Sequence, residues 1–291
     1  GATNGITVAA ELNDDNGEFL NVSGNTITYT GANTGLGLTV DEGSTTPTDV
    51  TIDGNEVVGD GAAGTGISLA GTTTELSLAD NSVDNIATGV SLGTGSQSTL
   101  TLSDLTLANI SSGTPVGVDA TGDLQTDAAV TLDGLAVDTS SGATAVAVGD
   151  DIDLTVADST IPAVSEAVDV TIAKAVTVTN TTITGASGNQ AVHIDKPGAS
   201  ASITIDGKTS IDQTDGDAIE VDLGDTENGQ SVTIDDVTLN GSTGAGVQVF
   251  NLDDSSATRP TVDITNSTFS DNGIGLDVDG ATDPESKLRA H

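Results

Sequence analysis

The sequence predicts an all-β solenoid, a chain that winds through about ten stacked coils of three short strands each. Two observations carry this prediction. A phrase of the form V-x-I-x-[G/D/N]-x-x-[V/I] recurs along the chain, and its apolar positions alternate as in a strand with one buried face. Aromatic residues make up only 1% of the sequence, so small aliphatic side chains must fill a narrow interior.

The first strand of each coil is predicted by the first and third letters of the phrase, which are apolar in every repeat. In "VTIDGNEVV" these letters are Val50 and Ile52. The phrase begins at Leu20, Val50, Leu76, Leu100, Val130, Leu154, Val176, Ile203, Val232 and Val262. The spacing averages about 27 residues, which is in the range of solenoid repeats.

A turn and a second strand follow. The fifth letter of every phrase is Gly, Asp or Asn, residue types that tolerate a left-handed backbone. The eighth letter is apolar again, except that the repeat at Ile203 slips by one residue to Ile211. A bend between two inward-facing strands is therefore expected in each coil.

A third strand is predicted by another short alternation that starts at Gly or Ala. It reads GISL, GVSL, AVAV, AVHI and GVQV, beginning at Gly66, Gly89, Ala145, Ala191 and Gly246. No segment shows helical periodicity with caps. The coil is expected to be triangular, with strands that pair with the coils above and below.

The whole chain is predicted to form one elongated domain. We expect an incomplete first coil or N-terminal cap over residues 1–19, a β-helix over 20–280 and a C-terminal tail over 281–291, whose end, "SKLRAH", has the character of an artificial extension. The chain has no Cys, which excludes disulfides and thiolate metal sites. No apolar run approaches the ~18 residues of a membrane-spanning helix.

The charge excludes whole classes of partner. Six Lys and Arg stand against 44 Asp and Glu, for a formal net charge of −38. Such a surface repels phosphate backbones and anionic headgroups, so neither nucleic acid binding nor membrane insertion is expected. External salt would screen the self-repulsion, which favours an extracellular or high-salt setting.

The repeated columns resemble the right-handed parallel β-helix, the pectate-lyase-like solenoid, and most of all its versions in bacterial autotransporter passengers and surface adhesins. The resemblance covers Leu20 to about Gly280. It implies a secreted or bacterial cell-surface protein that serves as an adhesin or spacing rod. Its partner would be a host-surface protein, a glycan or a second copy of the chain.

An exposed column of threonines is the main candidate binding face. The second letter of the phrase points outward and is Thr in most repeats: Thr51, Thr101, Thr131, Thr155, Thr177, Thr204 and Thr233. Regular hydroxyl arrays can order water on ice-binding solenoids. Thr is also simply a favourable exposed strand residue, which is the more economical explanation of the column.

The alternative function is a polysaccharide lyase or glycoside hydrolase, because family members place catalytic carboxylates on an outer face. Only Asp206, Asp235, Asp236 and Asp263, in three consecutive coils with Lys208 nearby, could form such a cluster here, and Asp206, Asp235 and Asp263 are its catalytic candidates. Binding an acidic polymer would require Arg or Lys clamps and aromatic stacking surfaces. The chain has almost none of either, so no catalytic residues are predicted and the protein is not expected to be an enzyme.

No cofactor is predicted beyond weakly bound Ca²⁺. Acidic residues crowd at Asp150 and Asp151 and again at Asp215 and Asp217, but neither stretch fits the EF-hand loop. His193, in "AVHI", is expected to point outward without partners, which argues against a catalytic triad or a zinc site. The remaining imidazole, His291, lies in the tail.

Overall fold

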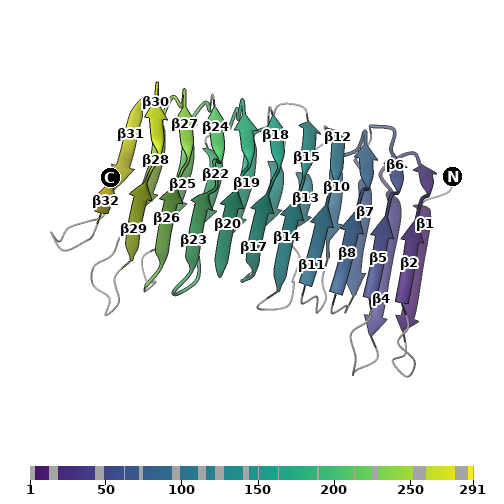
Figure 1. Cartoon of the computed structure of the whole chain (residues 1–291). Coiled ribbons are helices and arrows are strands. Elements are labelled where there is room, and N and C mark those ends of the chain that lie inside the picture. Colours follow the sequence, from purple (N-terminus) through teal and green to yellow (C-terminus); the bar gives the residue numbers. More distant parts are fainter. Residues whose placement is uncertain are drawn as a thin grey trace.

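The computed structural model confirms the all-β solenoid, with three parallel sheets. It describes residues 4–12, 19–42, 49–61, 63–71, 75–93, 99–110, 116–121, 128–139, 144–149, 151–162, 164–188, 190–212, 214–224, 229–251, 260–278 and 288–290. Within these ranges there are strands, turns and bends and no helix. Each coil passes once through each sheet, so the chain advances along a rod (Figure 1).

The described residues place eleven strands in each of two sheets and ten in the third. Sheet A contains β1 (Asn4–Leu12), β4 (Thr34–Glu42), β7 (Thr65–Gly71), β10 (Thr88–Leu92), β13 (Val116–Ala120), β16 (Thr144–Val148), β19 (Glu166–Thr171), β22 (Gln190–Asp195), β25 (Asp217–Asp222), β28 (Ala245–Phe250) and β31 (Ile274–Val278). Sheet B contains β2 (Phe19–Ser23), β5 (Asp49–Asp53), β8 (Glu75–Ala79), β11 (Thr99–Ser103), β14 (Ala129–Asp133), β17 (Asp153–Ala157), β20 (Ala175–Thr179), β23 (Ser202–Asp206), β26 (Ser231–Asp235), β29 (Thr261–Thr265) and β32 (Leu288–Ala290). Sheet C contains β3 (Thr26–Thr28), β6 (Glu56–Val58), β9 (Ser82–Asp84), β12 (Thr106–Ile110), β15 (Ala136–Thr139), β18 (Thr160–Pro162), β21 (Thr182–Thr184), β24 (Ser210–Asp212), β27 (Thr238–Asn240) and β30 (Thr268–Ser270).

The strand register follows the repeated phrase. The first letters of consecutive phrases lie directly opposite one another, as Val130 does with Leu154 and Leu154 with Val176. The two strands of each phrase lie in sheets B and C. The third apolar alternation forms the strands of sheet A. The repeat columns of the sequence are therefore columns of neighbouring side chains along the rod.

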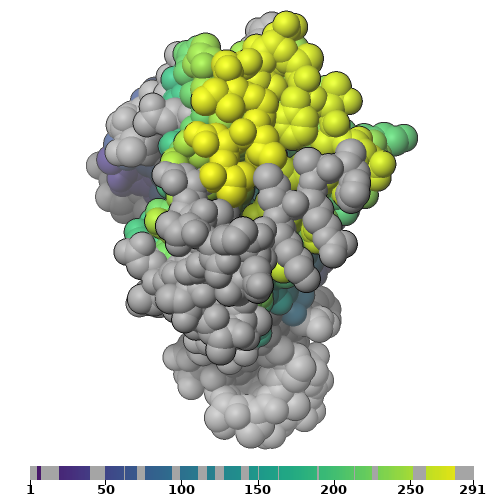
Figure 2. All heavy atoms as spheres, turned by 90° about the vertical axis from the view of Figure 1, so that its left-hand side faces the viewer, coloured from purple at the N-terminus to yellow at the C-terminus, as the bar shows by residue number. Residues whose placement is uncertain are grey.

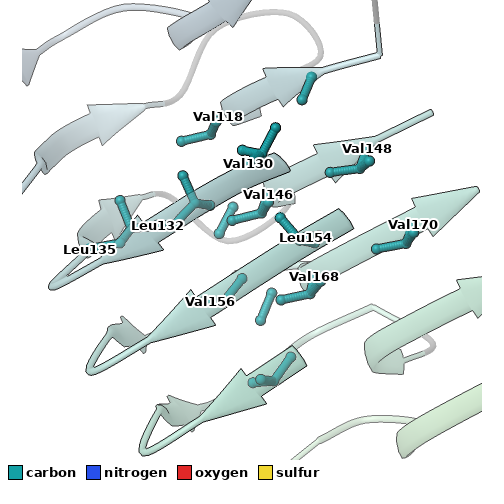
Figure 3. Packing of buried hydrophobic residues seen from close by; sticks show 14 of the residues in the cluster. Val118, Val130, Leu132, Leu135, Val146, Val148, Leu154, Val156, Val168 and Val170 are labelled. Atoms are coloured by element: carbon teal, nitrogen blue, oxygen red, sulfur yellow. The ribbon is translucent and has the colours of Figure 1, made fainter. Parts of the chain in front are cut away.

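The core is a continuous file of small aliphatic side chains between the sheets. Ile52 and Leu78 are 0% exposed, and in the middle of the rod Val and Leu side chains of sheets A and B point toward one another (Figure 3). Fully burying one such side chain stabilises the fold by about 1.5–3 kcal/mol. Because each coil adds several, the rod needs no large aromatic side chains.

The bend between sheets B and C is left-handed in every coil, as the fifth letter of the phrase predicts. The φ angles at these ten positions range from 47° to 69°. The residues are Gly24, Gly54, Asp80, Asp104, Gly134, Asp158, Asn180, Gly207, Asp236 and Asn266. These residue types adopt this conformation at little cost, which lets the chain turn a tight corner.

The residue after the bend points inward and forms a polar stack in the first coils. Asn25, Asn55 and Asn81 lie one above another, and Asn55 Oδ1 accepts hydrogen bonds from both the main-chain N–H and the side-chain amide of Asn25, at 3.1 and 2.9 Å. Asn55 and Asn81 are each 1% exposed. The amides thus satisfy main-chain groups that the corner leaves without strand partners.

The slip at Ile211 has a local cause. Both Gly207 and Lys208 are left-handed, with φ of 64° and 70°, and Thr209 N–H donates to the Asp206 carbonyl at 3.1 Å. This wider turn takes up one extra residue. Ile211 then lies opposite Ile183 and is 0% exposed.

Both ends of the chain contribute strands. In the segment expected as a first coil, β1 pairs with β4, and in the segment expected as a tail, β32 pairs with β29. Seen from the C-terminal end, the last coil forms part of the visible surface (Figure 2). Among the described residues, no helix has the length and apolar character needed to cross a membrane.

Candidate functional site

The predicted threonine column is a straight ladder on the outward face of sheet B. From Thr101 to Thr233, each threonine lies opposite the next in register, across six consecutive strands. The ladder members are Thr101, Thr131, Thr155, Thr177, Thr204 and Thr233. Thr51 belongs to the same column and is separated from Thr101 by Ser77.

The ladder side chains are partly exposed, and their hydroxyls sit on a regular lattice. Adjacent strands of a sheet are about 4.8 Å apart, so neighbouring hydroxyls repeat at that interval. Thr106, Thr160 and Thr182 lie in one exposed column on sheet C, in which Ala136 separates Thr106 from Thr160. The two columns belong to different sheets.

The three carboxylates of the enzymatic alternative lie in two outward columns of sheet B, the ladder column and one beside it. Asp263 is opposite Thr233 and so continues the ladder. Asp206 is opposite Thr179 in the column two residues further along the strands. Asp235, opposite Thr265, is the last residue of β26 and lies in the same column as Asp206. Asp263 therefore faces outward from a different column than the other two.

Asp235 is already engaged in hydrogen bonds. Its Oδ1 accepts from Thr265 Oγ1 at 2.6 Å and from Asn266 Nδ2 at 2.8 Å. The hydrogen bond from Thr265, followed by that from Asn266, lowers the pKa of the carboxyl. An ionised carboxylate held this way suits a structural acceptor or a base, and does not suit a general acid.

Of the described calcium candidates, Asp151 lies on a different coil from Asp215 and Asp217. Asp150 lies outside the described residues, and Asp151 lies in a bend before β17. Asp217, on β25, accepts a hydrogen bond from the Ala245 N–H of β28, whereas Asp215 lies in the preceding turn with its carbonyl bonded to the Thr243 hydroxyl. Among the described residues, no group of three or more His, Cys, Asp or Glu is arranged to hold a metal ion.

His193 corrects the sequence-based expectation. It does point outward, from β22 of sheet A, but it is not without partners. Its Nδ1 lies 3.0 Å from Asp169 Oδ1 on β19, and its Nε2 lies 3.5 Å from Glu220 Oε1 on β25. The imidazole is therefore held between carboxylates of the two neighbouring coils, and its side chain is only 26% exposed.

The surroundings of His193 are themselves organised. Gln190 Nε2 donates to Glu220 Oε2 at 2.8 Å and fixes that carboxylate. The hydrogen bond with Asp169 is the main cause that raises the pKa of His193. Burial, followed by the charge of Asp169, raises the pKa of Glu166. These groups form a compact carboxylate–imidazole cluster on sheet A.

The sequence did contain a signal for this cluster. The third strands of three successive coils read AVDV, AVHI and AIEV, and the third letter of each faces outward. In-register pairing places Asp169 opposite His193 and His193 opposite Glu220. The sequence analysis treated His193 within its own strand only and did not align this column across coils.

Two outward surfaces of the rod thus carry candidate functional groups. The ladder of sheet B offers neutral hydroxyls, and the cluster of sheet A offers an imidazole between carboxylates. No family model, curated protein or solved structure matches the chain.

Proposed function

We propose that this chain is a non-catalytic rod of a secreted or bacterial cell-surface protein, and that it acts as an adhesin or spacer through the outward face of sheet B. The observation that carries the proposal is the threonine ladder, unbroken from Thr101 to Thr233 and in register. A rigid array of neutral donors and acceptors suits a partner that is itself repetitive and rich in hydroxyl or amide groups. A surface glycan, an extended segment of a host protein or a second copy of the rod meets that description.

Many weak contacts can act together on such a face. A net hydrogen bond contributes about 0.5–1.5 kcal/mol, too little for one Thr to capture a partner. The strands hold the hydroxyls in place before binding, so little side-chain freedom is lost on contact. Affinity would therefore grow with the number of ladder positions engaged.

The charge favours neutral or cationic partners over anionic ones. A formal charge of −38 opposes the approach of an acidic polymer or a second rod at low salt, where the Debye length is about 30 Å at 0.01 M. At 0.15 M the length is about 8 Å, and contact through the hydroxyl face is no longer opposed at long range. Self-association, and adhesion to an anionic surface, should therefore strengthen with salt.

The test removes hydroxyls without changing shape. Thr131, Thr155 and Thr177 are replaced together by Val, which keeps the β-branched side chain. The matched control replaces Thr106, Thr160 and Thr182 on sheet C by Val. We expect weaker binding to glycan arrays and cell surfaces, and weaker self-association by sedimentation, for the sheet B variant only. Equal behaviour of both variants and the parent would contradict the proposal.

The enzymatic alternative makes a separate prediction. If Asp206, Asp235 and Asp263 acted on a polysaccharide, their replacement by Asn would abolish the release of unsaturated or reducing ends from an acidic polymer. A panel of pectin, alginate and related polymers, with and without Ca²⁺, measures this. Turnover by the parent that is lost in the triple variant would overturn the non-catalytic proposal.

A further inference from the structure

The imidazole of His193 is shared by two carboxylates that come from the neighbouring coils on either side. Its Nδ1 lies 3.0 Å from Asp169 Oδ1 on β19, and its Nε2 lies 3.5 Å from Glu220 Oε1 on β25. Across the described strands of sheet A, His193 is the only basic residue in its outward column. This side-chain contact across three coils therefore depends on one ring that can gain or lose a proton.

The number of N–H groups on the ring decides how many of the two carboxylates it can bind. The imidazolium has two N–H donors, one at each edge, whereas the neutral ring has one N–H and one lone pair. Asp169 is the nearer carboxylate and makes the hydrogen bond, so the single proton of the neutral ring stays on Nδ1. The lone pair of Nε2 then faces an oxygen of the ionised Glu220, and two electron-rich atoms in contact repel each other.

The charged groups that face the ring favour its protonated form. Asp169 and Glu166 face it from β19, and Glu220 faces it from β25. On its own strand, the Asp195 carboxylate lies 3.1 Å from the ammonium group of the lysine that follows it. The hydrogen bond with Asp169 is the main cause that raises the pKa of His193, and burial opposes it. The ring therefore releases its proton above the ordinary His value of 6.5.

We propose that His193 is a proton-dependent link between the coil of β22 and the coil of β25. In the imidazolium form the ring pairs with Glu220 Oε1, and loss of the Nε2 proton to solvent ends that pairing while the hydrogen bond to Asp169 remains. Solvent reaches both partners, because the side chains of His193 and Glu220 are 26% and 14% exposed. Gln190 has no titratable group and donates to Glu220 Oε2 at 2.8 Å, so only one of these two side-chain links responds to pH.

Loss of the proton changes two properties of the rod. The boundary between the coils of β22 and β25 loses one ion pair, so these coils adhere less strongly while the main-chain pairing between them stays intact. The outward face of sheet A also gains one unit of negative charge. The same two coils carry Thr204 and Thr233 on sheet B, but the link lies on sheet A and does not depend on the function proposed for the ladder.

The proton positions can be observed directly by NMR. In a His291→Ala background His193 is the only imidazole in the chain, so its two ring nitrogens are assigned without overlap. We expect Nδ1 to keep its proton across the titration and Nε2 to lose it, and the side-chain carboxyl resonance of Glu220 to shift with the same midpoint. A neutral ring that keeps its proton on Nε2, or a Glu220 resonance that does not follow the titration of His193, would overturn the proposal.

Double-mutant cycles test whether this link holds the coils together. Urea unfolding is measured for His193→Ala, Glu220→Ala and the double variant, on the acidic and on the basic side of the His193 midpoint. We expect a stabilising coupling on the acidic side that is lost or changes sign on the basic side. The matched control is the pair of Gln248 and Asp277, which bonds at 3.1 Å in the same outward column and contains no imidazole, so its alanine cycle should give the same coupling at both pH values. Equal coupling of His193 and Glu220 on both sides of the midpoint would show that the contact does not depend on the proton, and the proposal would be wrong.

Discussion

Replacing Asn55 by Ala should destabilise the N-terminal coils by about 2–4 kcal/mol. The Asn55 amide donates to the Val22 carbonyl at 2.8 Å and to Asn81 Oδ1 at 3.0 Å, and its oxygen accepts from Asn25. Asn55 is 1% exposed, so bulk solvent does not reach these groups. Leaving a buried polar group unpaired costs about 1–3 kcal/mol, and Asn55→Ala leaves at least two such groups unpaired.

The chain contains its own local reporter for this experiment. Tyr29 is the only tyrosine, there is no tryptophan, and its hydroxyl donates to the Thr65 carbonyl in the same region of the rod. Burial, followed by the charge of Asp60, raises the pKa of Tyr29 to about 12, so the phenol stays neutral at ordinary pH. Tyrosine fluorescence during urea unfolding therefore follows the N-terminal coils.

The control is Ser159→Ala, at the equivalent position several coils away. Ser159 Oγ accepts from the Leu135 N–H at 3.1 Å and donates to the Ala157 carbonyl, so the same kind of contact is lost far from Tyr29. The tyrosine transition should move to lower urea for Asn55→Ala and much less for Ser159→Ala. An unchanged transition in Asn55→Ala would refute the reasoning that the stack satisfies buried corner groups.

Two further predictions concern sheet A and its turns. The raised pKa values mean that the folded state favours the protonated forms of His193 and Glu166, so their contributions are complete below the ordinary values of 6.5 and 4.5. Stability should therefore fall as pH rises through each shifted value, and His193→Gln should flatten the upper of the two steps in urea midpoints measured across pH. Ile172 is 47% exposed at φ 60°, where a β-branched residue costs about 1–2 kcal/mol, so Ile172→Asn should raise the urea midpoint. A lowered midpoint would show that the Ile172 side chain stabilises the fold more than its backbone strain costs.

Much of the fold could be predicted because the sequence repeats its constraints. A single Asp at position 104 says little, but ten residues of one conformational type at the fifth letter specify a left-handed corner in every coil. The alternation at Val130 and Leu132 likewise specifies a buried face, and repetition specifies that coils stack in parallel. The threonine ladder followed from the same columns.

Predicting the cluster on sheet A would have required knowing which residues of neighbouring coils lie opposite one another. His193 becomes a partnered group only through Asp169 and Glu220, which lie on the two adjacent coils. The lengths of the intervening turns decide whether those residues meet. The Asn25–Asn55 stack was missed for a related reason. From the sequence alone, an Asn that follows a turn residue is expected to be exposed to solvent, whereas in the structure this side chain points into the rod.

The parallel stacking of coils also decides how the rod would carry a mechanical load. Tension between the two ends pulls on the hydrogen bonds of one coil at a time, because each coil is attached chiefly to the coils before and after it. A terminal coil that peels away releases about 27 residues, or roughly 90 Å of extended chain. The rod would then lengthen in steps under force and hold its remaining coils intact, so that a tether made from it dissipates a sudden pull before the attachment fails.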